Sequence, residues 1–255
     1  MGPEIRFEQV TRRFGAVIAV AAVDLTIASG SFVALVGESG SGKSTLLRAI
    51  NRLDETAGAS REGRVSIGGE PVDGLPAHEL RRRIGYVFQS IGLFPHMTVA
   101  TNIAIGRRVR GETLGESEIA MLLEQVGLPV DFVGRMPREL SGGQAQRVGI
   151  ARALAIEPEI LLLDEPFAAL DPVTRNALGK TVRALHDARG LTTILVTHDM
   201  AEAMLLADRV IVLAHGRIVA DATPADLAAG RGGAEAEALV AIPREQARRI
   251  AELGG

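Results

Sequence analysis

The chain has 255 residues, of which 47% are hydrophobic and 23% charged, a composition typical of a globular protein with one large domain or two small ones. Its formal net charge of −3 provides no basic field for a nucleic-acid partner, and the absence of cysteine excludes disulfide frameworks, thiolate metal sites and cysteine nucleophiles. The longest uncharged apolar run, residues 16–23, is far shorter than the roughly 20 residues of a membrane-spanning helix, and we expect no secretory signal.

The first part of the chain is predicted to consist mainly of strands. Apolar and polar residues alternate over 5–10 and 23–28, which favours half-buried antiparallel strands. The continuous apolar run 32–36 favours a strand buried on both faces, and a glycine-rich loop joins it to a helix over 44–52. Further elements are expected as strands over 65–67 and 84–88 and as a short helix over 77–82.

The second part of the chain begins with helical spacing and then alternates between strands and helices. The spacing over about 98–155 predicts an inserted helical subdomain, with clear helices over 116–126 and 142–155. The later alternation implies a mainly parallel sheet. Its expected elements are strands over 160–163, 192–196 and 209–213, helices over 172–189 and 200–206, and a helical tail from 224 with a break at 230–233.

The first chemical motif is a phosphate-binding loop between the buried strand and its helix. It comprises Gly37, Glu38, Ser39, Gly40, Ser41, Gly42, Lys43, Ser44 and Thr45. Its glycines let backbone N–H groups turn around a phosphate, and the helix adds the positive end of its dipole. Lys43 offers a charge to the β- and γ-phosphates and Ser44 a hydroxyl to Mg²⁺. The flanking strand and helix argue against an ordinary flexible Gly–Ser loop.

A second motif places two carboxylates after the strand predicted over 160–163. Ligands bind beyond the carboxyl ends of parallel strands, where Asp164 and Glu165 stand. Asp164 is suited to hold Mg²⁺ through water, and Glu165 to orient or deprotonate the attacking water. The alternative is an acidic cap on the next helix, which explains one carboxylate but not both.

A third motif opens the helix predicted over 142–155. Ser141, Gly142, Gly143 and Gln144 form a helix N-terminus with free N–H groups and little side-chain obstruction, which indicates a second anion site. Taken alone, Ser141 reads equally well as a simple helix cap.

Together these motifs resemble the ATP-binding subunits of ABC transporters over nearly the whole chain. The resemblance implies an α/β fold: a P-loop NTPase core with a mainly parallel sheet, an N-terminal antiparallel β subdomain and an inserted α-helical subdomain. It implies one ABC ATPase domain over 1–255, with the core and β subdomain in 1–97 and 156–223, the helical signature subdomain in about 98–155 and a short tail in 224–255. In the implied head-to-tail dimer, Ser141–Gln144 of one copy clamps ATP held by the other.

The resemblance also implies roles for four single residues. Phe14 corresponds to the aromatic residue that stacks on adenine, with an ordinary core Phe as the alternative. Gln89 corresponds to the glutamine that reaches the metal ion and the attacking water, so Ser44, Gln89 and Asp164 are the expected Mg²⁺ ligands. His198 matches the histidine that contacts the γ-phosphate. Asp171 matches the aspartate of a loop that crosses the dimer interface.

Two departures from the family pattern lie near the expected dimer contacts. The loop before Asp171 usually begins with Ser, where this chain has Ala168 and Ala169, which removes a hydroxyl from that contact. Ala145 replaces a common Gln.

The segment 89–99 is most similar to importer subunits of the osmoprotectant group, which handle quaternary amines such as glycine betaine or choline. Residues 166–167 and 170–175 agree with that group, but importers of amino acids, polyamines and sulfonates share most of the pattern. Longer members carry a pair of regulatory domains, which we do not expect in the roughly 30 residues after Pro224. Apolar side chains available to a helix of a membrane subunit, or to internal packing, are Ile91, Leu93, Phe94 and Met97.

The sequence thus predicts an ATPase that powers solute import, with Glu165, His198 and Gln89 in catalysis and with ATP and Mg²⁺ bound. Expected partners are a second copy, integral membrane permease subunits and a solute-binding protein that acts through the permease, with no nucleic acid. The expected location is the cytoplasmic face of the cell membrane, as a peripheral subunit. The less favoured alternatives are an importer of another small solute and a soluble ABC ATPase acting on nucleic acid or ribosomes.

Overall fold

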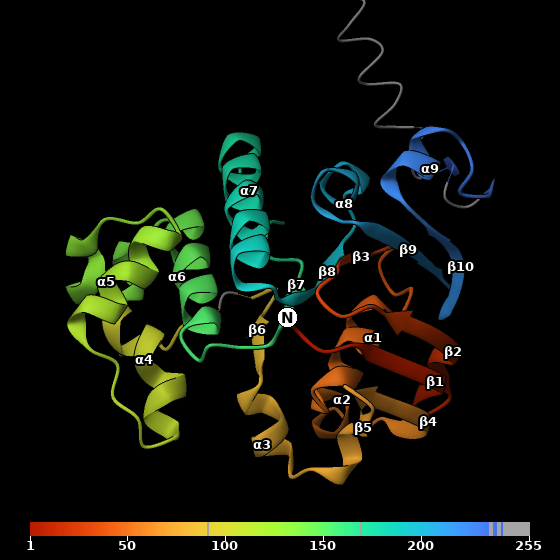
Figure 1. The fold of residues 1–255 in the computed structure, drawn as a ribbon, viewed down its shortest axis with the longest axis horizontal. Coiled ribbons are helices and arrows are strands. Elements are labelled where there is room, and N and C mark those ends of the chain that lie inside the picture. Colours follow the sequence, from red (N-terminus) through yellow and green to blue (C-terminus); the bar gives the residue numbers. More distant parts are fainter. Residues whose placement is uncertain (91, 169, 235–236, 239–240, 242–255) are drawn as a thin grey trace, which may run out of the picture. The chain divides into compact units, whose positions relative to one another are not determined.

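The computed structural model describes residues 1–90, 92–168, 170–234, 237–238 and 241 (Figure 1). The described chain falls into two compact units. The first contains Met1–Pro3 and Leu75–Thr193, and the second contains Glu4–Gly74 and the residues from Ile194 on. Of the predicted features, Ile91, Ala169 and most of the tail after 234 lie outside the described residues.

The second unit contains an antiparallel sheet with the strand order β2-β1-β4-β5, visible as adjacent arrows in Figure 1. Its strands are β1 (Ile5–Phe14), β2 (Val17–Ile27), β4 (Ser60–Ile67) and β5 (Glu70–Pro71). Alternation along β1 buries Ile5 and Phe7 and exposes Arg6 between them, as the sequence predicts. β2 begins at Val17 rather than at 23, because a tight turn with Gly15 at φ +56° pairs Val17 with Phe14.

A second group of strands in this unit contains β3 (Phe32–Val36), which is buried throughout, as predicted. β3 pairs in parallel with β9 (Arg209–Ala214), which pairs antiparallel with β10 (Arg217–Ala222). β10 was not predicted; a two-residue turn with positive φ at His215 and Gly216 creates it. The remaining elements of the unit are α1 (Lys43–Ile50), α2 (Leu53–Thr56), η1 (Val72–Gly74), α8 (Met200–Leu206) and α9 (Pro224–Ala228).

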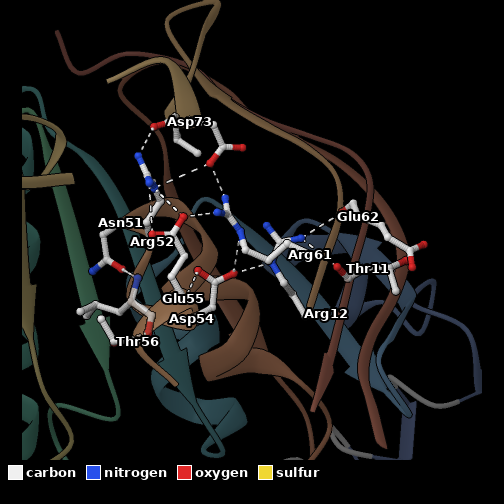
Figure 2. Close-up of polar contacts among 12 residues, drawn as sticks. Thr11, Arg12, Asn51, Arg52, Asp54, Glu55, Thr56, Arg61, Glu62 and Asp73 are labelled. Carbon is white, nitrogen blue, oxygen red and sulfur yellow. Dashed lines mark hydrogen bonds and ion pairs between the residues drawn. The ribbon is translucent and has the colours of Figure 1, made fainter. Parts of the chain in front are cut away.

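Buried charge links β1, α2 and β4 within the second unit (Figure 2). The Arg12 guanidinium donates to the Asp54 carboxylate, and their side chains are 1% and 0% exposed. Arg12 also donates to the carbonyls of Thr11 and Glu62, at 2.8 and 3.0 Å. The Arg61 guanidinium lies 3.7 Å from the same Asp54 oxygen, Oδ2. Burial of a charge is tolerable only when it is paired and hydrogen-bonded, and Arg12 meets both conditions.

The first unit combines parallel strands with most of the helices. β6 (Ile84–Val87) and β7 (Ile160–Asp164) pair in parallel. β8 (Thr192–Thr197) begins in this unit and continues into the second. The helices are α3 (Ala77–Arg82), α4 (Val99–Val109), α5 (Glu116–Gln125), η2 (Val130–Gly134), η3 (Pro137–Glu139), α6 (Gly142–Leu154) and α7 (Pro172–Arg189).

The helices α4, α5 and α6 pack together in the first unit and appear as a yellow-to-green cluster in Figure 1. Ile103, Leu123 and Val148, one from each helix, are all 0% exposed. The side-chain amide of Asn102 fixes the loop before α4, donating to the Phe94 and Met97 carbonyls at 3.1 and 3.0 Å. No helix among the described residues is long and apolar enough to cross a bilayer.

Candidate nucleotide site

The phosphate loop lies in the second unit and folds around its own lysine. Lys43 is 5% exposed, and its ammonium donates to the carbonyls of Gly37 and Glu38 at 2.8 and 2.7 Å. Gly37 and Gly42 have positive φ. A Cβ on Gly37 would lie 2.1 Å from Leu213 O, and a Cβ on Gly42 would lie 2.3 Å from Ala19 O. Only glycine therefore allows the loop this close approach, which leaves a cavity of about 330 Å³ beside it.

The helix after this loop has an N-terminus suited to an anion. No side chain caps α1 at Gly42, and its first turn contains no acidic residue. The positive end of its dipole therefore points toward a ligand such as a phosphate without a nearby carboxylate of the same turn. Ser44 and Thr45 lie half-buried in the first turn of this helix.

Phe14 and His198, the other two expected nucleotide contacts of this unit, lie at strand ends. Phe14 is half-buried at the end of β1. His198 directly follows β8 and is exposed. Its neighbour Asp199 caps α8 by accepting the N–H groups of Ala201 and Glu202, at 2.8 and 3.3 Å.

The two carboxylates of the second motif lie in the first unit with different surroundings. Asp164 is fully buried at the end of β7, and the hydroxyl of Tyr86 donates to its Oδ2 at 2.9 Å. Glu165 is half-buried with φ +47°, a conformation that costs a non-glycine residue about 1–3 kcal/mol. The side-chain amide of Gln89 donates to Glu165 Oε2 at 3.2 Å. The structure therefore brings Gln89 and Glu165 together.

Tyr86 was not identified from the sequence. It is the only tyrosine in the chain and stands in an otherwise apolar strand. The hydroxyl of a tyrosine within an apolar strand needs a hydrogen-bond partner. This need is the only signal for Tyr86 that the sequence contains. Naming Asp164 as that partner requires the pairing of β6 with β7.

The third motif forms one wall of a groove of about 540 Å³ in the first unit. Ser141 caps α6: its Oγ accepts the Gln144 N–H at 3.3 Å, while Gln144 Oε1 accepts the Ser141 N–H at 2.9 Å. The simple cap that the sequence allowed is therefore present. Phe132, Arg147, Leu170, Asp171 and Thr174 are among the other lining residues.

Asp171 lines the same groove and caps α7. Its Oδ1 accepts the N–H groups of Val173 and Thr174, at 3.1 and 3.0 Å. Hydrogen bonds from Thr174, side chain first, lower the pKa of Asp171 below its usual value. Ala145, on the far side of the first turn, is buried.

The donor types suit a hard cation. In the first unit Asp164 and Gln89 offer carboxylate and amide oxygen, and in the second unit Ser44 offers a hydroxyl; the described residues contain no cluster of three or more His, Cys, Asp or Glu side chains that could hold a metal ion by themselves. Mg²⁺ fits such a set, because it is usually held by one or two carboxylates together with the phosphates of a substrate.

Comparison with known proteins places these features in one family. The family model for ABC transporters matches residues 20–168. The glycine betaine uptake system ATP-binding protein YehX of Escherichia coli is 47% identical over 86% of this chain and 71% of its own length. The sulfate/thiosulfate import ATP-binding protein CysA of Mycobacterium tuberculosis is also 47% identical, over 85% of this chain and 60% of its own. OpuCA of Bacillus subtilis, a glycine betaine/carnitine/choline transport ATP-binding protein, is 44% identical, and the chain spans 58% of its length.

Solved structures agree with the sequence comparisons. The dimeric structure of MJ0796, described as a bacterial ABC transporter cassette, superposes with a TM-score of 0.77 at 35% identity and covers 86% of this chain and 98% of its own. A dimeric post-hydrolysis state of the same cassette, bound to ADP and Pi, superposes equally well. The predicted fold class, a core with an antiparallel N-terminal sheet and a mostly parallel sheet, is confirmed. The chain therefore belongs to the ABC transporter family and is one of its ATPases.

Proposed function

We propose that this chain is the ATP-hydrolysing subunit that powers solute import by an ABC transporter. The observation that carries the proposal is the Gln89–Glu165 hydrogen bond directly beside the buried Asp164. It holds a carboxylate and an amide together where a water molecule could be oriented and deprotonated. The relatives named as import or uptake ATP-binding proteins support the same function.

Within the second unit, the nucleotide contacts form a series along the ATP molecule. Phe14 stacks on adenine, and the loop from Gly37 to Thr45 surrounds the phosphates. Lys43 exchanges its carbonyl partners for phosphate oxygens. His198 contacts the γ-phosphate from the end of β8.

Glu165 and Gln89 act on the attacking water. Glu165 accepts a proton from the water as its oxygen bonds to the γ-phosphorus, and the bond to the β-phosphate oxygen breaks to give ADP and phosphate. Gln89 orients the water through its side-chain amide. Ser44, Gln89 and Asp164 would hold Mg²⁺, which when bound neutralises charge on the β- and γ-phosphates.

A second copy completes the site in this proposal. Ser141, Gly142, Gly143 and Gln144 of one copy face the nucleotide on the other, and Asp171 lies at the dimer interface. The dimeric MJ0796 cassettes support this arrangement. ATP produces movement only if it binds the closed dimer more tightly than the open one.

The permease is the partner of the loop before α4. Phe94 is 41% exposed although its backbone is fixed by Asn102, and Leu93 and Met97 are half-buried beside it. A short helix of a membrane subunit can cover these side chains. We place the chain on the cytoplasmic face of the membrane, with a solute-binding protein acting through the permease. The names of YehX and OpuCA support an osmoprotectant as the solute, whereas CysA supports the alternative of another small solute.

Glu165→Gln tests the ATPase assignment. We expect the variant to bind ATP, to lose turnover by about 10³-fold or more, and to form a dimer with ATP on size-exclusion chromatography, because the bound nucleotide is no longer consumed. Lys43→Ala is the control: it should weaken nucleotide binding and form no dimer. Turnover by Glu165→Gln at the normal rate would refute Glu165 as the catalytic carboxylate.

A further inference from the structure

Tyr86 lies beside the carboxylate that the proposed function assigns to the metal ion. Its hydroxyl donates to Asp164 Oδ2 at 2.9 Å, and both residues belong to the first unit. No motif in the sequence gives this tyrosine a role.

The strand register directs Tyr86 toward Asp164. Tyr86 pairs with Leu162 across the parallel strands β6 and β7. Asp164 is two residues beyond Leu162, so its side chain points to the same face of the sheet. The diagonal separation suits a long aromatic side chain. The ring of Phe88 lies 4.5 Å from that of Tyr86 at an angle of 56°, which limits the other positions open to the phenol.

The hydrogen bond constrains the carboxylate without adding a positive charge. An ionised Asp only accepts hydrogen bonds, and rotation about its last side-chain bond is otherwise broad. A donor on Oδ2 restricts this rotation. A neutral phenol, unlike Arg or Lys, does not compete with the cation by its own charge.

We propose that Tyr86 is a positioning residue that orients Asp164 for the divalent cation bound with the nucleotide. The inference rests on the proposed function, in which Asp164 holds Mg²⁺. Partners that orient metal-binding carboxylates typically contribute 10–100-fold to metal affinity. Tyr86 is therefore expected to control metal affinity much more strongly than nucleotide affinity.

Tyr86→Phe removes one oxygen atom and leaves the ring against Phe88, so the fold is retained. Mn²⁺ serves as the probe, because free Mn²⁺ is measured directly by electron paramagnetic resonance in the presence of saturating ADP. We expect the Mn²⁺ dissociation constant of Tyr86→Phe to rise about tenfold. Metal-free binding of ADP in EDTA should change less than twofold. In the ATPase assay, the Mg²⁺ concentration for half-maximal rate should rise by the same factor.

A double-mutant cycle separates this role from simple packing. If Tyr86 acts through Asp164, adding Tyr86→Phe to Asp164→Asn should change Mn²⁺ affinity by less than twofold. Thr223→Val is the matched control: it also removes a hydroxyl that donates to a carboxylate, Asp226 at 2.7 Å, but lies outside the nucleotide-binding segments. Its Mn²⁺ affinity should equal that of the natural chain.

The natural chain contains its own spectroscopic probe. With one tyrosine and no tryptophan, its intrinsic tyrosine fluorescence comes from Tyr86 alone. Adding Mg²⁺ to the ADP complex should change this fluorescence with the same midpoint as metal binding, because the Tyr86 hydroxyl is hydrogen-bonded to Asp164.

The outcomes distinguish the two proposals. Equal Mn²⁺ affinity in Tyr86→Phe and the natural chain, while Asp164→Asn loses affinity, would overturn the role of Tyr86 and leave the ATPase assignment intact. Loss of ADP affinity in EDTA equal to the loss of Mn²⁺ affinity would show a structural role and also overturn it. Unchanged Mn²⁺ affinity in Asp164→Asn would overturn the metal role of Asp164 in the proposed function and, with it, the role of Tyr86.

Discussion

Two buried aspartates with different partners illustrate how partners decide what a carboxylate does. Asp54 is fully buried and pairs with the guanidinium groups of Arg12 and Arg61 (Figure 2), so its charge is offset by cations and serves the packing of β1 against α2. Asp164 is equally buried but receives a hydrogen bond from a neutral phenol. In the proposed function, Asp164 contributes to the binding of a cation from outside the protein.

Arg12→Ala should destabilise the protein strongly. The substitution removes the ion pair with Asp54 and the bonds to two carbonyls, and it leaves a buried carboxylate with a weaker partner. Breaking such a pair costs about 3–5 kcal/mol. The free energy of unfolding from urea denaturation measures the loss.

Arg6→Ala is the matched control for this substitution. Arg6 is on the same strand, but its ion pair with Glu4 is 51% and 42% exposed, so its loss should cost under about 1 kcal/mol. Equal losses for the two variants would contradict the energetic importance of the buried pair.

The sequence identified residues whose chemistry depends on local spacing and missed those that depend on pairing between distant segments. The phosphate loop could be predicted because its glycines, Lys43 and Ser44 are contiguous. Arg12 and Asp54 are 42 positions apart, and Tyr86 and Asp164 are 78 apart. No local pattern marks such partners, because the strand register brings them together.

At the scale of elements, residues that cap a helix explain why its predicted bounds agree with the structure. The helix expected over 172–189 is observed with the same bounds, since Asp171 caps its start, Pro172 occupies its first turn and Gly190 ends it in the left-handed conformation. β10 and the first half of β2 escaped prediction. Both are hairpin strands defined by a turn and a partner strand rather than by alternation of their own residues.

The cap of α7 predicts a pH-dependent stability. Hydrogen bonds from Thr174 and Val173 lower the pKa of Asp171 in the folded chain. The ionised carboxylate therefore adds to the free energy of unfolding above the pKa of the unfolded chain. This contribution is lost as the pH falls through the pKa of the folded chain. Asp171→Ala should therefore lower Tm by about 2–4 °C at pH 7 and by less at pH 3.

Asp171→Asn is the control for the cap, because its amide oxygen accepts the same N–H groups at every pH. Its Tm should stay near that of the natural chain at pH 7. A loss equal to that of Asp171→Ala would show that the cap does not stabilise α7. Thermal unfolding followed by circular dichroism at both pH values measures these shifts.

At the scale of the whole molecule, the sequence predicted the family because three phosphate- and water-handling motifs occur in one order. The chain is 47% identical both to a relative named for glycine betaine uptake and to one named for sulfate import, so overall identity does not distinguish the solute. The apolar loop at Phe94, whose ring is exposed, is the proposed contact of this ATPase with its membrane partner.

The most direct test of the central claim, that this ATPase drives a membrane permease, is capture of its partners. Tagged Glu165→Gln, loaded with Mg-ATP, is used to isolate complexes from detergent-solubilised membranes of the native host, with Phe94→Asp in the same background as the control. We expect mass spectrometry to identify a multi-span permease, and the control to recover much less of it. Recovery of only soluble proteins or nucleic acid by a demonstrably dimeric Glu165→Gln would contradict the importer and favour a soluble ABC ATPase.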